Sequence, residues 1–201
     1  MAERIGWTRD QQLIALRLYM RTPFGQDREY AVDQPVEFDH RHHVRDDGIE
    51  CRFCHASVER SATAGIPSTA VCMGCHAQIW NDSPMLEPVR RAWFSGAPIP
   101  WNRVHDLPDF VYFDHSVHVT RGIGCESCHG RVDLMARMRQ DQPLTMRWCL
   151  DCHRDPGPNR RPISEVTNMK WAPPRDVATL AAQLDRERPV NPPTDCSGCH
   201  R

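Results

Sequence analysis

All ten cysteines of this 201-residue chain fall into five Cys-x-x-Cys pairs, and a histidine follows each pair directly. No cysteine lies outside these pairs. Numbered along the chain, the five motifs are Cys51-Arg-Phe-Cys54-His55, Cys72-Met-Gly-Cys75-His76, Cys125-Glu-Ser-Cys128-His129, Cys149-Leu-Asp-Cys152-His153 and Cys196-Ser-Gly-Cys199-His200. A chain with this pattern must fold around five copies of the same local chemistry.

The histidine after each pair separates covalent haem from the other cysteine chemistries. Zinc ribbons and ferredoxins also use Cys-x-x-Cys, but they place no requirement on the next residue. A disulfide scaffold leaves the five histidines unexplained. In a c-type site the two thiols bond to the haem vinyl groups, and the adjacent histidine is the proximal iron ligand. The sequence therefore predicts five covalently bound haem c groups, attached through the ten cysteines and ligated by His55, His76, His129, His153 and His200.

Composition indicates what surrounds these groups. The chain has 17 prolines and a mean hydropathy of -0.60, which leaves little sequence for long elements or a large apolar core. We expect a mainly α chain with extensive loops, little or no sheet, and a core formed by stacked haems. The net charge of -1 and the absence of a Lys/Arg run argue against a nucleic-acid partner.

An internal repeat nominates distal haem ligands. The segment 38–51 matches the segment 113–125 with a single-residue deletion, as expected of a duplicated two-haem module built as Phe-x-His-x-x-His followed by two motifs. His42 falls opposite Val117 in this alignment, so we interpret it as a surface residue. Histidines three apart on a helix point in different directions, so each can reach a different haem. The paired distal candidates are His40 with His115 and His43 with His118.

The fifth distal ligand is less constrained. Six histidines lie outside the motifs, and removing His42 leaves five candidates for five irons. The fifth of these, His105, lies outside the repeat and could serve the last haem or one of the first four. Met146 and Met169 are possible alternative axial ligands, because a His/Met iron has a higher potential than a bis-histidine iron.

These features divide the chain into five expected segments. The N-terminal arm contains a short amphipathic helix at Thr8 to Arg21, which is too short and too charged to span a bilayer, and no cleavable signal precedes it. The tail contains a polar helix at Arg175 to Arg188 between proline pairs. The segments are the arm at 1–37, the first dihaem module at 38–80, a connector at 81–108, the second dihaem module at 109–160, and a tail with the fifth haem at 161–201.

The number of candidate axial ligands favours electron relay over catalysis. A catalytic haem needs a free iron face for its substrate, whereas this chain supplies five plausible distal histidines for five irons. A multihaem enzyme of the nitrite or hydroxylamine type is the competing class, but no Cys-x-x-Cys-Lys variant is present. A soluble periplasmic electron shuttle is a second alternative.

From about Gln34 onward the chain resembles the pentahaem cytochrome subunit of alternative complex III, a membrane quinol-oxidising assembly. The resemblance implies a haem wire on the periplasmic side of the cytoplasmic membrane. It also implies electron entry from an iron–sulfur or molybdopterin-like subunit, with a monohaem cytochrome c or terminal oxidase as acceptor. The stretches that carry it are Pro35-Val-Glu-Phe-Asp-His40, Trp101-Asn-Arg-Val-His-Asp-Leu-Pro-Asp-Phe-Val-Tyr-Phe-Asp-His-Ser-Val-His118, Cys125 to Val132 and Met146-Arg-Trp-Cys-Leu-Asp-Cys-His-Arg-Asp-Pro156.

The sequence departs from the family at its N-terminus. The resemblance implies an N-terminal transmembrane anchor, and residues 1–37 depart from that pattern. We expect either an anchor outside the numbered chain or attachment through other membrane subunits of the complex. Related periplasmic quinone-reductase complexes use similar multihaem subunits, which leaves the direction of electron flow open.

Overall fold

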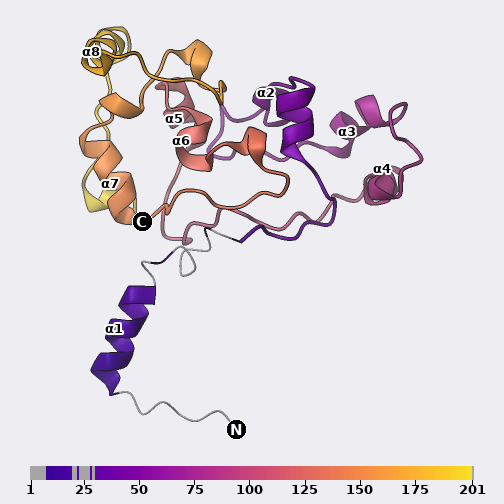
Figure 1. Cartoon of the computed structure of the whole chain (residues 1–201), viewed down its shortest axis with the longest axis horizontal. Helices are drawn as coiled ribbons and strands as arrows, with labels where there is room; N and C mark the ends of the chain where they lie inside the picture. The colour runs from indigo at the N-terminus through magenta and orange to yellow at the C-terminus, as the bar shows by residue number, and fades with distance from the viewer. Residues whose placement is uncertain (1–7, 20–21, 23–27, 29, 201) are drawn as a thin grey trace.

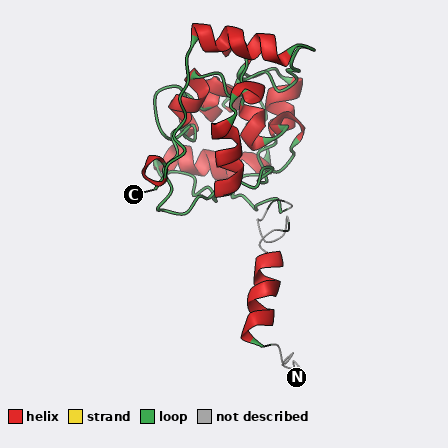
Figure 2. Ribbon diagram, turned by 90° about the vertical axis from the view of Figure 1, so that its left-hand side faces the viewer, coloured by secondary structure: helices red, strands yellow, loops and turns green. Residues whose placement is uncertain are grey.

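The computed structural model describes residues 8–19, 22, 28 and 30–200. Short helices joined by long loops make up the described chain, and Figure 2 shows them as red segments in a largely green trace. Pairing between extended segments in these residues is limited to three isolated bridges, Ala31 with Arg139, Val111 with His200, and Ile123 with Arg160. The prediction of a mainly α chain with extensive loops and almost no sheet is confirmed.

The α-helices are one to three turns long. The remaining helical segments are a π-helical turn, η2 (Arg41–Asp46), and 3-10 turns, the last of which, η7 (Cys196–Gly198), carries the fifth motif. The described α-helices are α1 (Arg9–Tyr19), α2 (Cys51–Cys54), α3 (Thr69–His76), α4 (Glu87–Ser95), α5 (His115–Thr120), α6 (Cys125–His129), α7 (Met146–Arg154) and α8 (Val177–Glu187). The other 3-10 turns are η3 (Pro84–Leu86), η4 (Val132–Leu134), η5 (Gly157–Asn159) and η6 (Ile163–Glu165).

Side-chain caps place the helices that carry ligands. Asp114 accepts a hydrogen bond from the Ser116 amide at 2.8 Å and begins α5. Thr145 accepts one from the Trp148 amide at 3.4 Å and begins α7. These caps satisfy amide groups that have no partner within the helix. Capping thus fixes where α5 and α7 start.

The two helices predicted from sequence are present. The helix predicted at Thr8 to Arg21 is α1, although residues 20 and 21 lie outside the described residues. It stands apart from the other helices in both views (Figures 1 and 2). The polar helix predicted at Arg175 to Arg188 is α8. None of the described helices combines the length and the apolar composition needed to cross a bilayer.

The apolar core formed by side chains is small. Its central cluster consists of Val58, Val119 and Val166, with Ala64 and Ile163 packed against it. Large apolar side chains instead remain exposed beside the motifs. Examples are Phe53 at 59%, Trp80 at 63% and Phe113 at 36%. Side-chain packing alone therefore supplies little of the interior, as the composition predicts.

Arg160 ties the C-terminal helix to the rest of the structure. Its side chain is 1% exposed and pairs with Asp185 on α8. The guanidinium also donates to the carbonyls of Leu184 at 3.1 Å, Arg188 at 2.7 Å and Arg121 at 3.1 Å. Because Arg121 follows α5, one buried side chain connects α8 to the helix that carries two ligand candidates.

Arg161 performs the same task for the third motif. Its guanidinium donates to Glu126 Oε1 at 2.6 Å and lies 4.5 Å from the centre of the Trp171 ring. Gly124 makes this approach possible, since a Cβ there would lie 2.1 Å from Arg161 Cζ. The buried arginine thereby fixes the start of α6, which carries the third motif.

Candidate haem-binding site

The first copy of the repeat holds its two histidines against one phenylalanine. The Phe38 ring stacks on His43 at 4.4 Å and contacts His40 edge-on at 4.7 Å. His43 lies on the π-helical turn, and its Nδ1 donates to the Asp39 carbonyl at 3.0 Å. The buried Nδ1 of His40 has no hydrogen-bond partner among the described residues. The hydrogen bond of His43 Nδ1 leaves Nε2 of that ring available to a metal, whereas no such bond selects a nitrogen of His40.

The second copy repeats this geometry closely. Phe113 stacks on His118 at 4.5 Å and contacts His115 edge-on at 4.8 Å. His118 Nδ1 donates to the Asp114 carbonyl at 2.7 Å, as its counterpart does in the first copy. His115 Nδ1 donates to the Ala62 carbonyl at 2.8 Å, which joins the two modules. The duplication seen in the sequence is therefore also a duplication of histidine placement.

The histidines of the motifs are oriented through Nδ1. Four of the five donate this N–H to a main-chain carbonyl, which fixes the tautomer and leaves Nε2 for a metal. The exception is His129, whose Nδ1 lies 3.2 Å from Nε2 of His105. The four donor and acceptor pairs are His55 with Gly65 at 2.7 Å, His76 with Ile79 at 3.0 Å, His153 with Pro193 at 2.7 Å and His200 with Phe110 at 3.3 Å.

Three repeat histidines face motif histidines across equal gaps. With metal–nitrogen bonds of about 2.0 Å, two imidazoles on opposite sides of one ion have ring centroids about 6 Å apart. The three observed separations are 6.1 Å for His43 with His76, 6.1 Å for His115 with His129 and 6.1 Å for His118 with His153. The residues present therefore fit bis-histidine ligation of the second, third and fourth haems.

Burial keeps the central histidines neutral. The pKa of His129 is lowered to about 3, mainly because burial disfavours the charged imidazole. The neighbouring His105 and His115 lower it further. The pKa of His40 is lowered to about 4, again mainly by burial, and the neighbouring His55 and His43 lower it further. Neutral imidazole is the form that binds iron, so no proton has to be displaced at neutral pH. The proximity of His40 to His55 agrees with the repeat, which makes this pair the counterpart of His115 with His129.

The ten cysteines are free thiols. Interactions between thiols of different motifs indicate which of the first three motifs are neighbours in space. The pKa of the Cys54 thiol is raised mainly by burial. The nearby Cys72 thiol is the next largest cause, and Cys51 and Cys75 add smaller effects. The first motif therefore adjoins the second. A hydrogen bond between the thiols of Cys51 and Cys125 lowers the pKa of Cys51 and raises that of Cys125. The first motif thus adjoins the third as well.

The same kind of contact places the last two motifs. The pKa of the Cys128 thiol is raised to about 12, mainly by burial, and the neighbouring Cys152 and Cys149 thiols raise it further. Burial and then the Cys199 thiol raise the pKa of Cys149. The third motif therefore adjoins the fourth, and the fourth adjoins the fifth. In space the motifs follow the order second, first, third, fourth, fifth.

Covalent haem suits this arrangement better than a compact metal ion site. Among the described residues, no three His, Cys, Asp or Glu side chains gather as ligands of one ion. The paired thiols and facing imidazoles instead match thioether attachment with an axial ligand on each side of a haem. A haem held there supplies one-electron oxidation and reduction at its iron.

The remaining ligand candidates occupy different environments. The His42 side chain is 55% exposed and lies 3.4 Å from Asp47, which agrees with its interpretation as a surface residue. Met146 is 66% exposed at the start of α7. Met169 is 8% exposed and lines a pocket of about 260 Å³ together with Cys51.

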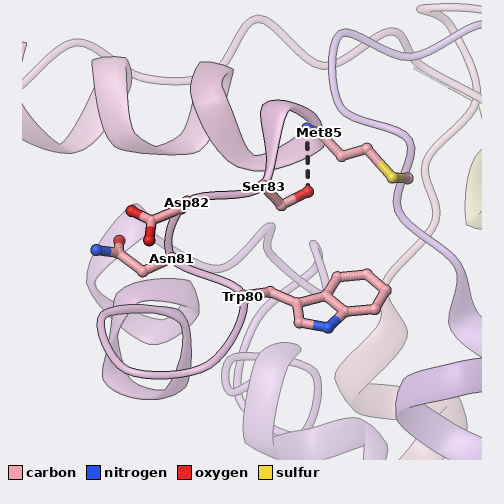
Figure 3. A pocket seen from close by; sticks show the side chains of 5 residues that line it. All are labelled: Trp80, Asn81, Asp82, Ser83 and Met85. Carbon is pink, nitrogen blue, oxygen red and sulfur yellow. Dashed lines mark hydrogen bonds between the residues drawn. The ribbon is translucent and has the colours of Figure 1, made fainter.

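A pocket lined by residues that follow α3 does not gather catalytic groups. It has a volume of about 420 Å³ and lies between α3 and α4. Figure 3 shows its lining, in which the Met85 amide donates to Ser83 Oγ at 3.3 Å and Asp82 is the one acidic side chain. Its lining residues are Trp80, Asn81, Asp82, Ser83 and Met85. The chemically distinctive side chains of the chain lie along the motifs instead.

Sequence reasoning missed the groups that orient the ligands. The carbonyls of Gly65, Ile79, Pro193 and Phe110 carry no signal in their residue types, because any residue supplies a carbonyl. The contact between His105 and His129 crosses 24 positions and follows no periodicity. The repeat already contained Phe38 and Phe113, but their stacking on His43 and His118 became visible only in the structure.

Comparison with known proteins agrees with this geometry. Residues 111–201 match the family described as cytochrome c7 and related cytochrome c. The chain is 37% identical over 102 residues to the multihaem cytochrome c subunit of menaquinone reductase from Nitratidesulfovibrio vulgaris (strain Hildenborough), covering 48% of this chain and 46% of that protein. The match thus spans about half the length of this relative. The part of the chain from residue 111 onward is therefore similar to cytochrome c7 and related cytochromes c.

Proposed function

We propose that this chain carries five haem c groups and relays electrons within a quinone-linked membrane complex. The observation that carries the proposal is the series of interactions between cysteine thiols of neighbouring motifs, from the second through the first, third and fourth to the fifth. Three gaps of 6.1 Å between histidine rings lie along this series. Irons with a histidine on each side have no open face for a substrate, so their use is electron transfer.

The spatial order identifies the two ends of the wire. The second motif, on α3, lies at one end, and the fifth motif, on η7, lies at the other. Figure 1 shows α3 and the C-terminus on opposite sides of the helical body. Electrons would therefore enter and leave near these two motifs, and the first, third and fourth motifs would form the middle of the path.

The complex we propose is alternative complex III, with this chain on the periplasmic side of the cytoplasmic membrane. The resemblance of its long motif-containing stretches supports this assignment. An iron–sulfur or molybdopterin-like subunit and other membrane subunits would then adjoin one end of the wire. A monohaem cytochrome c or terminal oxidase would adjoin the other. The similarity to a menaquinone reductase subunit supports attachment to a quinone-linked complex, whether electrons flow from the quinol or toward the quinone.

Purification from the native membrane tests the proposal. An affinity-tagged chain should be recovered from detergent extracts together with a quinol-oxidising activity, and its haems should be reduced when a menaquinol analogue is added. Recovery of the chain alone from the soluble periplasmic fraction would contradict the proposal and favour a soluble electron shuttle. A spectrum that shifts on addition of nitrite or hydroxylamine would favour an enzyme.

A further inference from the structure

His105 and His129 form the closest ring contact between any two described histidines. Their ring centroids are 4.4 Å apart with the planes at 83°, and His105 Nε2 lies 3.2 Å from His129 Nδ1. We propose that His105 is a positioning residue that accepts a hydrogen bond from the haem ligand His129, and that it is not itself an axial ligand. The inference rests on the proposed attachment of haem at the third motif.

The geometry separates this contact from an axial pair. Two imidazoles across one iron need about 6 Å between centroids, and 4.4 Å is too short to place a metal between them. The contact also involves Nδ1 of His129, whereas the metal-binding nitrogen in the other motifs is Nε2. His115 already lies 6.1 Å from His129, with its ring plane within 5° of parallel. His115 is therefore the distal partner of the third motif.

His105 takes the place that a main-chain carbonyl takes elsewhere. The motif histidines His55, His76, His153 and His200 all donate Nδ1–H to a carbonyl oxygen. At the third motif the acceptor is an imidazole nitrogen. For that role His105 is neutral, with its proton on Nδ1 and its lone pair on Nε2. Such an acceptor fixes the ligand ring and increases its electron donation to the metal.

The connector holds His105 in position through a reciprocal amide contact. The Asn102 amide donates to Gln34 Oε1 at 2.9 Å, and Gln34 Nε2 donates to the Asn102 carbonyl at 2.8 Å. Asn102 Nδ2 also donates to the Asp33 carbonyl at 2.7 Å. These bonds attach the chain three residues before His105 to the segment that precedes the first repeat. The connector is thus anchored where a fixed acceptor is required.

The assignment also changes the ligand count. Without His105, the four repeat histidines serve the first four motifs, as the three measured pairs and the proximity of His40 to His55 indicate. The iron at His200 then takes a ligand other than these histidines. His105 therefore contributes to the properties of the third haem, not to the coordination of the fifth.

Three variants of the full chain test the assignment. His105→Leu removes the acceptor, His105→Gln replaces it with an amide oxygen, and His118→Leu removes an axial ligand as a reference. Haem content is measured first by the pyridine haemochrome assay. Low-spin and high-spin haems are then counted by EPR and resonance Raman spectroscopy, and midpoint potentials are measured by potentiometric titration.

We expect His118→Leu to convert one haem from low spin to high spin. His105→Leu should keep the wild-type spin count but raise the midpoint potential of a single haem, because a weaker donor stabilises ferric iron less. His105→Gln should restore that potential toward the wild-type value. A new high-spin haem in His105→Leu would overturn the assignment and make His105 an axial ligand. Unchanged potentials would overturn it too.

The haem content separates a failure of the proposed haem attachment from a failure of the role proposed for His105. If wild-type protein carries no haem at the third motif, the proposed haem attachment fails independently of His105. If wild-type protein and all three variants carry equal amounts of haem, the spin count and the potentials judge the role of His105 alone.

Discussion

His42 and His43 are adjacent in sequence and lie in different environments. His43 is stacked on Phe38 and faces His76 across 6.1 Å, whereas the His42 side chain is 55% exposed and lies beside Asp47. One position along a helix rotates a side chain by about 100°, so adjacent residues cannot both face the same haem. The repeat distinguished these two residues because only His43 has a counterpart in the second copy.

Substitution of each histidine tests this distinction. We expect His43→Leu to convert one of the five haems to a high-spin form, because its iron loses an axial ligand. His42→Leu should leave the low-spin spectrum unchanged and alter stability by less than about 0.5 kcal/mol, as is usual at exposed positions. Resonance Raman spectra of the two purified variants make the comparison. Equal spectra for both variants would contradict the placement of His43.

Asp133 supplies a prediction of pH dependence. Its side chain is 3% exposed and accepts hydrogen bonds from Arg131 Nε at 2.7 Å and Nη2 at 2.6 Å. These bonds lower the pKa of the carboxyl below its usual 3.8. A depressed folded pKa means that the stabilisation is present above the unfolded pKa and is lost as the pH falls through the folded pKa.

We therefore expect Asp133→Asn to lower the free energy of unfolding by about 1–3 kcal/mol at pH 7, since the charge-assisted hydrogen bonds of a buried carboxylate are weakened. The deficit should shrink as the pH falls below 3.8. Guanidinium denaturation followed by far-UV circular dichroism at several pH values measures it. Asp106→Asn is the matched control, because both side chains of the Arg103 and Asp106 pair are about 70% exposed. A constant deficit from pH 7 to pH 2 would contradict this account.

At the scale of elements, buried arginine contacts hold the short helices where periodic packing is weak. Arg160 joins α8 to the end of α5 through three carbonyls and Asp185. We expect Arg160→Met to reduce the free energy of unfolding by about 2–4 kcal/mol, because it removes the ion pair and the three carbonyl hydrogen bonds of a buried guanidinium. Chemical denaturation of the haem-loaded chain checks the value.

Arg147→Met is the control for Arg160→Met. Its side chain is 89% exposed and lies 3.6 Å from Asp151, so its loss should change stability by less than about 1 kcal/mol. Equal effects of the two substitutions would show that burial of Arg160 contributes nothing to the attachment of α8.

The sequence predicted some elements and not others for physical reasons. The helices α1 and α8 were found because each is bounded by a polar cap or by prolines and has a recognisable composition. The π-helical turn η2 was not found, since its residues carry no signal different from that of an α-helix. The roles of Arg160 and Arg161 were also missed, because a sequence shows charge but not burial.

At the scale of the whole molecule, the sequence predicted the chemistry but not its order in space. Cysteine spacing nominated the attachment residues, which stay a prediction, and the repeat nominated the histidines that the structure places near the motifs. The contact between Cys51 and Cys125 joins positions 74 residues apart, so no local pattern reports it. Assignment of His105 likewise required the fold. The five segment boundaries stay predictions.

The central claim is that each of the five motifs carries a covalently bound haem. The most direct test is the ratio of haem to protein, measured by the pyridine haemochrome assay on the purified chain and by the intact mass of the denatured protein. The account predicts five haems per chain and a mass increment equal to five haem groups that survives denaturation. A ratio clearly below five, or haem that dissociates on denaturation, would contradict it.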